Sequence, residues 1–255
     1  MMFDMERTRV AAGGQVAPSA GVHPASRRRL ASVVVEDFAR RIISGSLPAG
    51  APLPTEEALG REFGFSRTVM REGMKLLEER RLVRVEQGRG TTVEPREHWN
   101  MLDADVLRIA LEYDEEMTLI DDLVAVRRVL EGQMARAAAA RLSDEELAAL
   151  ADNVDQMVNA VGDYATFDAL DHGFHRILMR ASASEIGTTI VAAIHDYARE
   201  NATFRGPAGA ELLEHTVAEH RAILEALAAR DGDLAATRVM AHIESAWVER
   251  QKSFS

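Results

Sequence analysis

The feature that most limits the fold is an unbroken series of helical apolar patterns from Glu116 to Gln251. Large apolar residues recur three or four positions apart throughout, and no stretch alternates with the two-residue period of a strand. Because each such helix buries one apolar stripe, the helices must pack together. The pattern predicts an antiparallel bundle of six helices, namely Glu116–Arg141, Asp144–Val161, Tyr164–Ala181, Glu185–Asn201, Glu211–Arg230 and Asp233–Gln251.

The chain before this bundle has shorter and more interrupted helical patterns. Three prolines between Leu47 and Pro54 exclude a helix there. Thr55 and Ser66 are residue types that cap helix N-termini. We therefore expect three helices, from Leu30 to about Gly45, from Thr55 to about Phe63 and from Ser66 to about Glu79.

Two strand-like runs follow the third helix, Leu82–Val85 and Thr91–Glu94. The glycines of the intervening Gln87-Gly88-Arg89-Gly90 allow the positive φ angles that a hairpin turn needs. Three helices and a hairpin predict a winged helix-turn-helix. The expected fold class is therefore mainly helical, with this small domain ahead of an all-helical antiparallel bundle.

These patterns divide the chain into four segments. Residues 1–26 contain few large apolar side chains and are expected to be disordered. The winged helix-turn-helix is expected over residues 27–95 and the helical domain over 116–251. The linker, residues 96–115, contains Trp99 and a short helical pattern from Asp103 to Leu111.

Composition limits where such a chain can work. The 255 residues include no cysteine, which excludes disulfides and thiolate metal sites. The N-terminal residues lack the apolar core of a secretory signal, and no stretch reaches the roughly 18 uncharged apolar residues of a membrane span. We therefore expect a cytoplasmic protein.

The net charge of −11 is unevenly distributed along the chain. Residues 27–95 contain 13 basic and 10 acidic residues, a balance of +3, whereas residues 96–255 contain 15 and 29, a balance of −14. Binding to nucleic acid depends on the local field and not on the total charge. The acidic total therefore does not exclude DNA as a partner of the N-terminal third.

The third expected helix has the pattern of a recognition helix. Met70, Met74 and Leu77 form its apolar stripe, while Arg67, Arg71 and Lys75 share another face. Basic side chains there can contact base edges and phosphates in the major groove, and a wing tip at residues 87–90 can reach the minor groove. For the helix alone, a solvated basic face is an equally good explanation.

The N-terminal third also resembles the DNA-binding domain of GntR-family regulators. The resemblance rests on ordered motifs in residues 43–56, on Phe65 to Glu72, and on Gly88-Arg89-Gly90-Thr91. It implies operator contacts, so the predicted DNA-binding residues are Ser66, Arg67, Thr68, Arg71, Lys75, Gln87, Gly88, Arg89 and Gly90. One departure is Glu57, where members often have arginine; an acid cannot bind phosphate, so Glu57 is excluded.

Polar groups also interrupt the apolar stripes of the bundle. Helical projection places Asp171 and His175 at the border of one stripe, and His220 and His242 on the inward faces of two later helices. Four such groups in an apolar interior are costly unless they share an ion. Imidazole and carboxylate ligands suit Zn, Ni, Mn or Fe(II), and four of them around an octahedral ion leave two positions for a bidentate acid.

The bundle resembles the FCD ligand-binding domain found in one subgroup of the GntR family. The pattern that carries the resemblance is Asp171/His175, then Glu219-His220, then His242-Ile243. It implies a divalent metal, with zinc the first expectation, held by Asp171, His175, His220 and His242.

Other polar residues of the bundle allow alternative interpretations. Arg127 lies beside its stripe, where it can bind an effector carboxylate or form an internal ion pair with Glu131. His195 can line a pocket, although a structural or surface role is the stronger expectation. Projection points Asp168 and His172 further outward than Asp171.

A last resemblance concerns the ligand class. Residues 98–107 are similar to the linker of family members that respond to sugar acids, the galactonate-operon repressors among them. The resulting hypothesis is a homodimeric repressor that binds a palindromic operator and is released by a small carboxylic acid. The alternatives are a metal-dependent hydrolase, a sensor of metal alone, a purely structural metal, or activation in place of repression.

Overall fold

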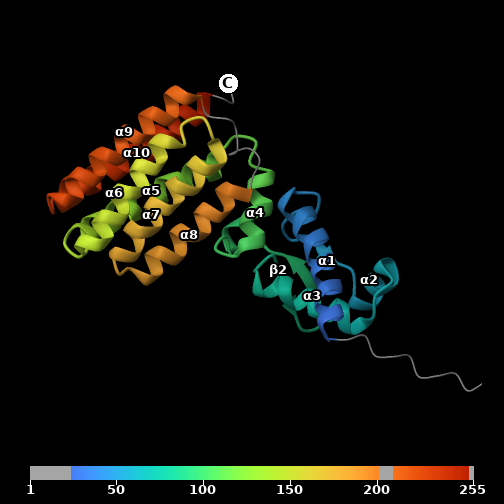
Figure 1. The fold of residues 1–255 in the computed structure, drawn as a ribbon. Helices are drawn as coiled ribbons and strands as arrows, with labels where there is room; N and C mark the ends of the chain where they lie inside the picture. The colour runs from blue at the N-terminus through green and yellow to red at the C-terminus, as the bar shows by residue number, and fades with distance from the viewer. Residues whose placement is uncertain (1–23, 201–208, 253–255) are drawn as a thin grey trace, which may run out of the picture. The chain divides into compact units, whose positions relative to one another are not determined.

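The computed structural model describes residues 24–200 and 209–252, which divide into two compact units between Asn100 and Met101 (Figure 1). Each unit is described by itself. Most of the expected tail, residues 1–23, lies outside the described residues. The first helix begins at Pro24 and so includes the last three residues of that segment. Proline is well suited to the first position of a helix, where its missing N–H has no partner to lose.

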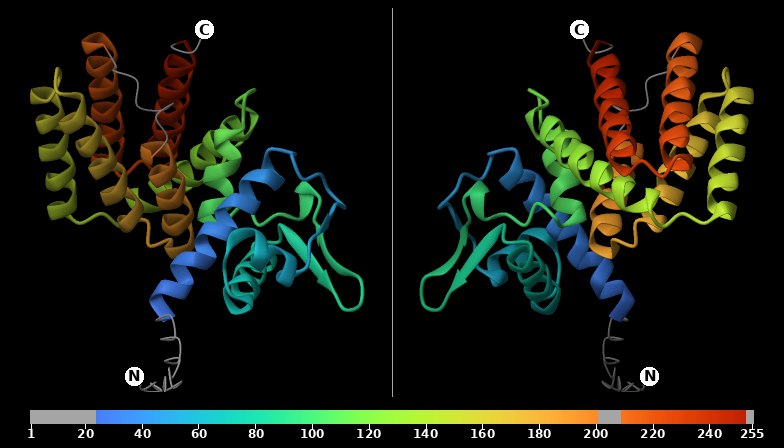
Figure 2. Two further views of the ribbon diagram at one scale, coloured as in Figure 1. Left: turned by 90° about the vertical axis from the view of Figure 1, so that its right-hand side faces the viewer. Right: turned by 90° about the vertical axis from the view of Figure 1, so that its left-hand side faces the viewer.

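The N-terminal unit is a winged helix-turn-helix, as predicted. Its helices are α1 (Pro24–Ile43), α2 (Glu56–Phe63) and α3 (Arg67–Glu79), followed by β2 (Val83–Glu86), β3 (Gly90–Val93) and the 3₁₀ turn η1 (Arg96–His98). The predicted caps are confirmed, since Thr55 Oγ1 accepts from the Ala58 N–H and Ser66 Oγ from the Val69 N–H. Figure 2 shows the β2–β3 hairpin extending beyond the helices of this unit.

The sheet contains a strand that the sequence did not predict. β1 (Pro52–Leu53) pairs antiparallel with β3 at the edge of the sheet, in the order β1-β3-β2. The prolines that exclude a helix also conceal a strand, because proline is tolerated only at such an edge.

In the core of this unit, a Cβ added at Gly73 on α3 would lie 3.2 Å from Val34 on α1. The two helices therefore approach closely, and this closeness fixes the position of α3.

All regular elements of the C-terminal unit are helices, within its described residues. It contains α4 (Ala104–Glu112), α5 (Thr118–Ala139), α6 (Asp144–Asn159), α7 (Tyr164–Ala181), α8 (Glu185–Glu200), α9 (Ala210–Ala228) and α10 (Gly232–Lys252). The predicted helices α5 to α10 are all present, with ends displaced by at most a few residues. The helix expected in the linker is α4, which belongs to this unit.

The helices of the bundle pack around one interior region, into which α7, α9 and α10 each turn one side. α5 packs along α10, and α7 packs against both α5 and α6 (Figures 1 and 2). α8 contacts α5 and α7, while α9 contacts α5, α6 and α10. Apolar residues such as Phe174, Leu178, Ile223 and Val239 fill the core between them. The polar side chains that project inward from α7, α9 and α10 therefore converge.

Candidate functional site

Four predicted metal ligands meet inside the bundle. Asp171 and His175 come from α7, His220 from α9 and His242 from α10. One ligand atom from each lies within 4.8 Å of the others. His175 and His220 are fully buried and His242 is 3% exposed. We refer to these residues as the four-residue cluster.

Each histidine of the cluster has its Nδ1 atom occupied by an orienting acceptor. His175 donates from Nδ1 to Glu131 Oε2 (2.5 Å), and His220 donates to the Thr216 carbonyl (2.9 Å). His242 donates from Nδ1 to Glu219 Oε2 (2.8 Å). A ring that donates from Nδ1 keeps a lone pair on Nε2. This is the outer-shell arrangement that fixes metal-binding histidines in the correct tautomer.

The Nε2 atoms of the cluster are left without a satisfactory protein partner. His220 Nε2 is buried and has no hydrogen-bond partner among the described residues. His175 Nε2 and His242 Nε2 face each other at 3.3 Å, so that two lone pairs oppose one another. A shared cation resolves both problems, because it accepts all three lone pairs. The residues present therefore fit a divalent metal.

Burial and charge set the protonation of the cluster. Burial lowers the pKa of His220 to about 3, so the ring is neutral near pH 7. For Asp171, burial raises the pKa, but the charges of His175, His220 and His242 outweigh it and hold the pKa below its usual range. The cluster thus offers a neutral imidazole at His220 and an ionised carboxylate at Asp171, the forms that bind metals.

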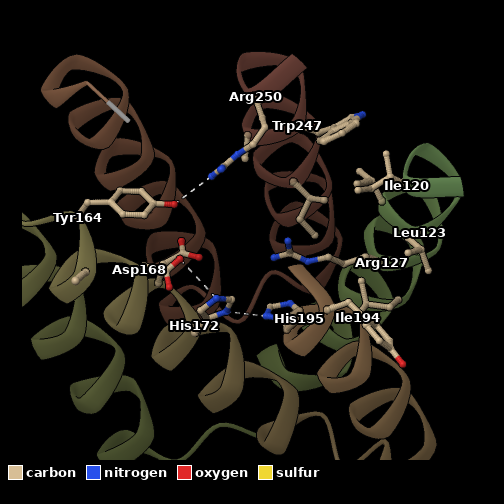
Figure 3. Close-up of a pocket in the computed structure, with 16 residues that line it drawn as sticks. Ile120, Leu123, Arg127, Tyr164, Asp168, His172, Ile194, His195, Trp247 and Arg250 are labelled. Atoms are coloured by element: carbon tan, nitrogen blue, oxygen red, sulfur yellow. Dashed lines mark hydrogen bonds and ion pairs between the residues drawn. The ribbon is translucent and has the colours of Figure 1, made fainter. Parts of the chain in front are cut away.

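A cavity of about 500 Å³ lies beside the cluster, between α5, α7, α8 and α10 (Figure 3). Asp171 lines this cavity and also belongs to the cluster, so a molecule in the cavity can reach the metal position. Arg127 and Arg250 project into it, and the Arg250 guanidinium donates to the Tyr164 hydroxyl at 3.2 Å. The apolar part of the wall includes Ile194, Ile243 and Trp247.

The structure contains the internal ion pair that was one of the two interpretations of Arg127, and it places the same side chain at the cavity. Its Nε donates to Glu131 Oε1 at 2.5 Å, and its side chain also lines the cavity. Glu131 is fully buried; burial raises its pKa, but Arg127 and His175 outweigh that and hold the pKa well below its usual range. The sequence considered Glu131 only as a partner for Arg127 and missed its hydrogen bonds to His175 and His195. In the sequence, the only indication of a role for Glu131 was its position four residues after Arg127.

Three residues near the cluster differ from the sequence expectation. Asp168 and His172 were expected to point outward, yet both line the cavity. His195 lines the cavity, which was the less favoured of its two interpretations; it is 6% exposed and hydrogen-bonds both Glu131 and His172. The helical projection assigned Asp168 and His172 to the outer side of α7. That side faces a cavity that other helices enclose, and the pattern of one helix cannot show this.

The predicted DNA-binding residues form an exposed set on the N-terminal unit. All nine are exposed: Ser66, Arg67, Thr68, Arg71, Lys75, Gln87, Gly88, Arg89 and Gly90. Met70, Met74 and Leu77 are buried on the opposite face of α3, as predicted. The excluded Glu57 has a role that the sequence did not reveal, because it forms ion pairs with Arg67 (2.5 Å) and Arg61 (3.1 Å).

A winged helix-turn-helix with an exposed basic recognition helix, followed in the chain by a helical bundle, defines the class of DNA-binding regulators. Two family models match the chain. Residues 30–93 match the gntR family of bacterial regulatory proteins, and residues 122–245 match the FCD domain. The chain belongs to the GntR family of transcriptional regulators and contains an FCD domain.

Relatives agree with this assignment, and a solved structure shares the fold. The chain is 31% identical to the galactonate operon transcriptional repressor of Escherichia coli over 83% of its length and 93% of the relative's. It is 33% identical to the Glc operon transcriptional activator of Escherichia coli over 63% of each chain. The structure of Lar, which controls the Listeria monocytogenes agr system, matches 88% of this chain and 97% of its own, with 19% identity and a TM-score of 0.53.

Family membership decides between the classes of function left open above. Proteins of this family are transcriptional regulators that bind operator DNA, not enzymes, so the hydrolase alternative is set aside. Among the described residues, no helix combines the length and the hydropathy that crossing a bilayer requires.

Proposed function

We propose that this protein is a repressor that leaves its operator when a small carboxylic acid binds in the cavity of the FCD domain. The observation that carries the proposal is the four-residue cluster, whose ligand atoms all lie within 4.8 Å of one another and whose Asp171 also lines the cavity. The similarity to a galactonate operon repressor supports repression and, together with the linker resemblance, a sugar acid as ligand.

A divalent metal would be held by Asp171, His175, His220 and His242, with zinc as the first candidate and nickel, manganese or iron(II) as others. When bound, the metal supplies a positive charge and open coordination positions for an acid. Arg127 is the residue of this chain that we assign to the acid's carboxylate. Glu131 holds its Nε, which leaves the terminal guanidinium nitrogens for the ligand.

The nine exposed residues of α3 and of the β2–β3 turn are the proposed operator contacts. Arg67, Arg71 and Lys75 would contact base edges and phosphates in the major groove, and residues 87–90 the adjacent minor groove. A homodimer would place two such units on a palindromic operator. Release requires that the acid bind more tightly to the conformation with low operator affinity, since a ligand with equal affinities shifts nothing.

Operator binding with defined metal and acid tests this function. Metal-loaded protein should protect a specific DNA site, and an acid that stabilises the protein against heat should remove the protection. Absence of a protected site at moderate salt under every condition would contradict DNA-binding regulation. If protection follows metal concentration alone and no acid affects it, the protein is a metal sensor, the second function that the cluster permits.

A further inference from the structure

The cavity wall contains a chain of hydrogen bonds that starts at a buried carboxylate and ends in the cavity. Glu131 Oε1 and His195 Nε2 are 3.0 Å apart, and His195 Nδ1 and His172 Nδ1 are 2.8 Å apart. His172 Nε2 then lies 3.7 Å from Asp168 Oδ1. Figure 3 shows Asp168, His172 and His195 in this order along the wall.

The position of each proton in this series of hydrogen bonds follows from its buried end, Glu131. The Glu131 carboxylate only accepts, so His195 donates from Nε2. The hydrogen bond between the Nδ1 atoms of His195 and His172 requires a lone pair on one of them, and a His195 ring that donates from Nε2 supplies it. His172 must then donate from Nδ1 to His195. His172 Nε2 makes no hydrogen bond to the neighbouring Asp168 carboxylate, as a protonated nitrogen would, so we assign it as an acceptor.

Two acceptors therefore lie side by side at the cavity surface. Both His172 Nε2 and Asp168 Oδ1 accept hydrogen bonds, and their separation of 3.7 Å is too long for a bond between them. Water can donate to both when the cavity holds no ligand. A ligand that displaces this water without providing donors leaves both acceptors unpaired, and that loss of hydrogen bonding weakens binding.

We propose that Asp168 and His172 form a specificity subsite that receives hydroxyl hydrogens of the ligand, and so selects hydroxylated acids over unsubstituted acids. This rests on the proposed function, in which Arg127 and the metal hold the carboxylate. A hydroxyl suits the position better than an ammonium group, because Arg127 and Arg250 already place two cations in the same cavity. Neither Asp168 nor His172 is a member of the four-residue cluster.

The binding experiment compares aldonates of four to six carbons with unsubstituted acids of equal length on metal-loaded protein by calorimetry. The wild type should bind an aldonate more tightly than its partner acid. Asp168→Asn should weaken the aldonate by about 10-fold or more and the unsubstituted acid by less than about 2-fold. Arg127→Lys should weaken both acids alike, and Asp152→Asn, an exposed acid on α6 outside the cavity, should weaken neither.

The outcomes separate this subsite from the proposed function. If no acid binds the wild type, acid sensing is wrong and the subsite is wrong with it. If aldonates and unsubstituted acids bind equally, or if Asp168→Asn affects both alike, only the subsite is overturned. A ligand-free measurement is independent of both: nitrogen-15 NMR should find the proton of His172 on Nδ1 and that of His195 on Nε2. The opposite tautomer at His172 would overturn the proposal.

Discussion

The two units of this protein hold their functional residues in opposite environments. In the N-terminal unit, basic side chains are exposed, and acids pair with them at the surface, as in Arg67–Glu57, with side chains 72% and 54% exposed. In the FCD unit, His175 and Glu131 are paired at zero exposure. Screening by water and salt limits the first kind of pair, whereas desolvation dominates the second. A substitution should therefore be mild and salt-dependent in the first unit, and severe and pH-dependent in the second.

The largest effect is expected at a metal ligand. His220→Ala should lower metal affinity by more than about 100-fold, roughly 3 kcal/mol, because loss of an outer-shell partner alone costs 10–100-fold. Competition with a chromogenic chelator measures it. Operator affinity of the metal-free protein should not change, because the substitution leaves the DNA-binding surface intact. Metal affinity equal to that of the wild type would show that His220 is not a ligand.

Acidification should affect the buried histidines next. Burial lowers the pKa of His220 to about 3 and of His195 to about 4, below the value of about 6.5 in an unfolded chain. Between these values the unfolded state binds more protons, so stability decreases as pH falls. From pH 7 to pH 5, metal-free protein should lose about 2 kcal/mol for each histidine.

Urea unfolding followed by Trp247 fluorescence in a Trp99→Phe background reports on this loss, since Trp247 belongs to α10 and is 9% exposed. The chain contains two tryptophans, and this substitution leaves only the one in the FCD unit. A midpoint that stays constant between pH 7 and pH 5 would mean that these rings are not buried in neutral form.

A smaller effect is expected at the recognition helix. Arg71→Ala should weaken operator binding by about 10-fold and reduce the dependence on salt, because a solvated side chain loses one contact with DNA. Fluorescence anisotropy at several salt concentrations measures both. Metal affinity serves as the control and should remain at the wild-type value. An equal loss on operator and random DNA would assign Arg71 to phosphate contact and not to base recognition.

The smallest effect is expected at Glu57, which pairs with Arg67 at the surface. Glu57→Gln should free a cation and remove an anion near the DNA, so affinity should rise by about 3-fold at low salt and return to the wild-type value at high salt. Weaker binding would show instead that Glu57 holds Arg67 in the orientation needed for the operator. Asp144→Asn, in the other unit, is a matched control with no expected effect on DNA affinity.

The sequence by itself determined the local elements of both units. Helical periodicity and the caps at Thr55 and Ser66 predicted where α2 and α3 begin, because these signals depend only on neighbouring residues. The same periodicity identified all four members of the cluster, since each ligand lies on or beside the apolar stripe of its own helix. It also separated the buried face of α3 from the exposed one.

Only the tertiary structure decided what surrounds the cluster. Glu131 orients His175 from a helix 44 residues away along the chain, and Asp168, His172 and His195 meet in a cavity that α5, α7, α8 and α10 enclose together. A helix's own pattern shows which side is apolar, but not which neighbouring helices close over its polar side. For the same reason β1 escaped prediction, because two residues become a strand only when β3 supplies the hydrogen-bonding partner.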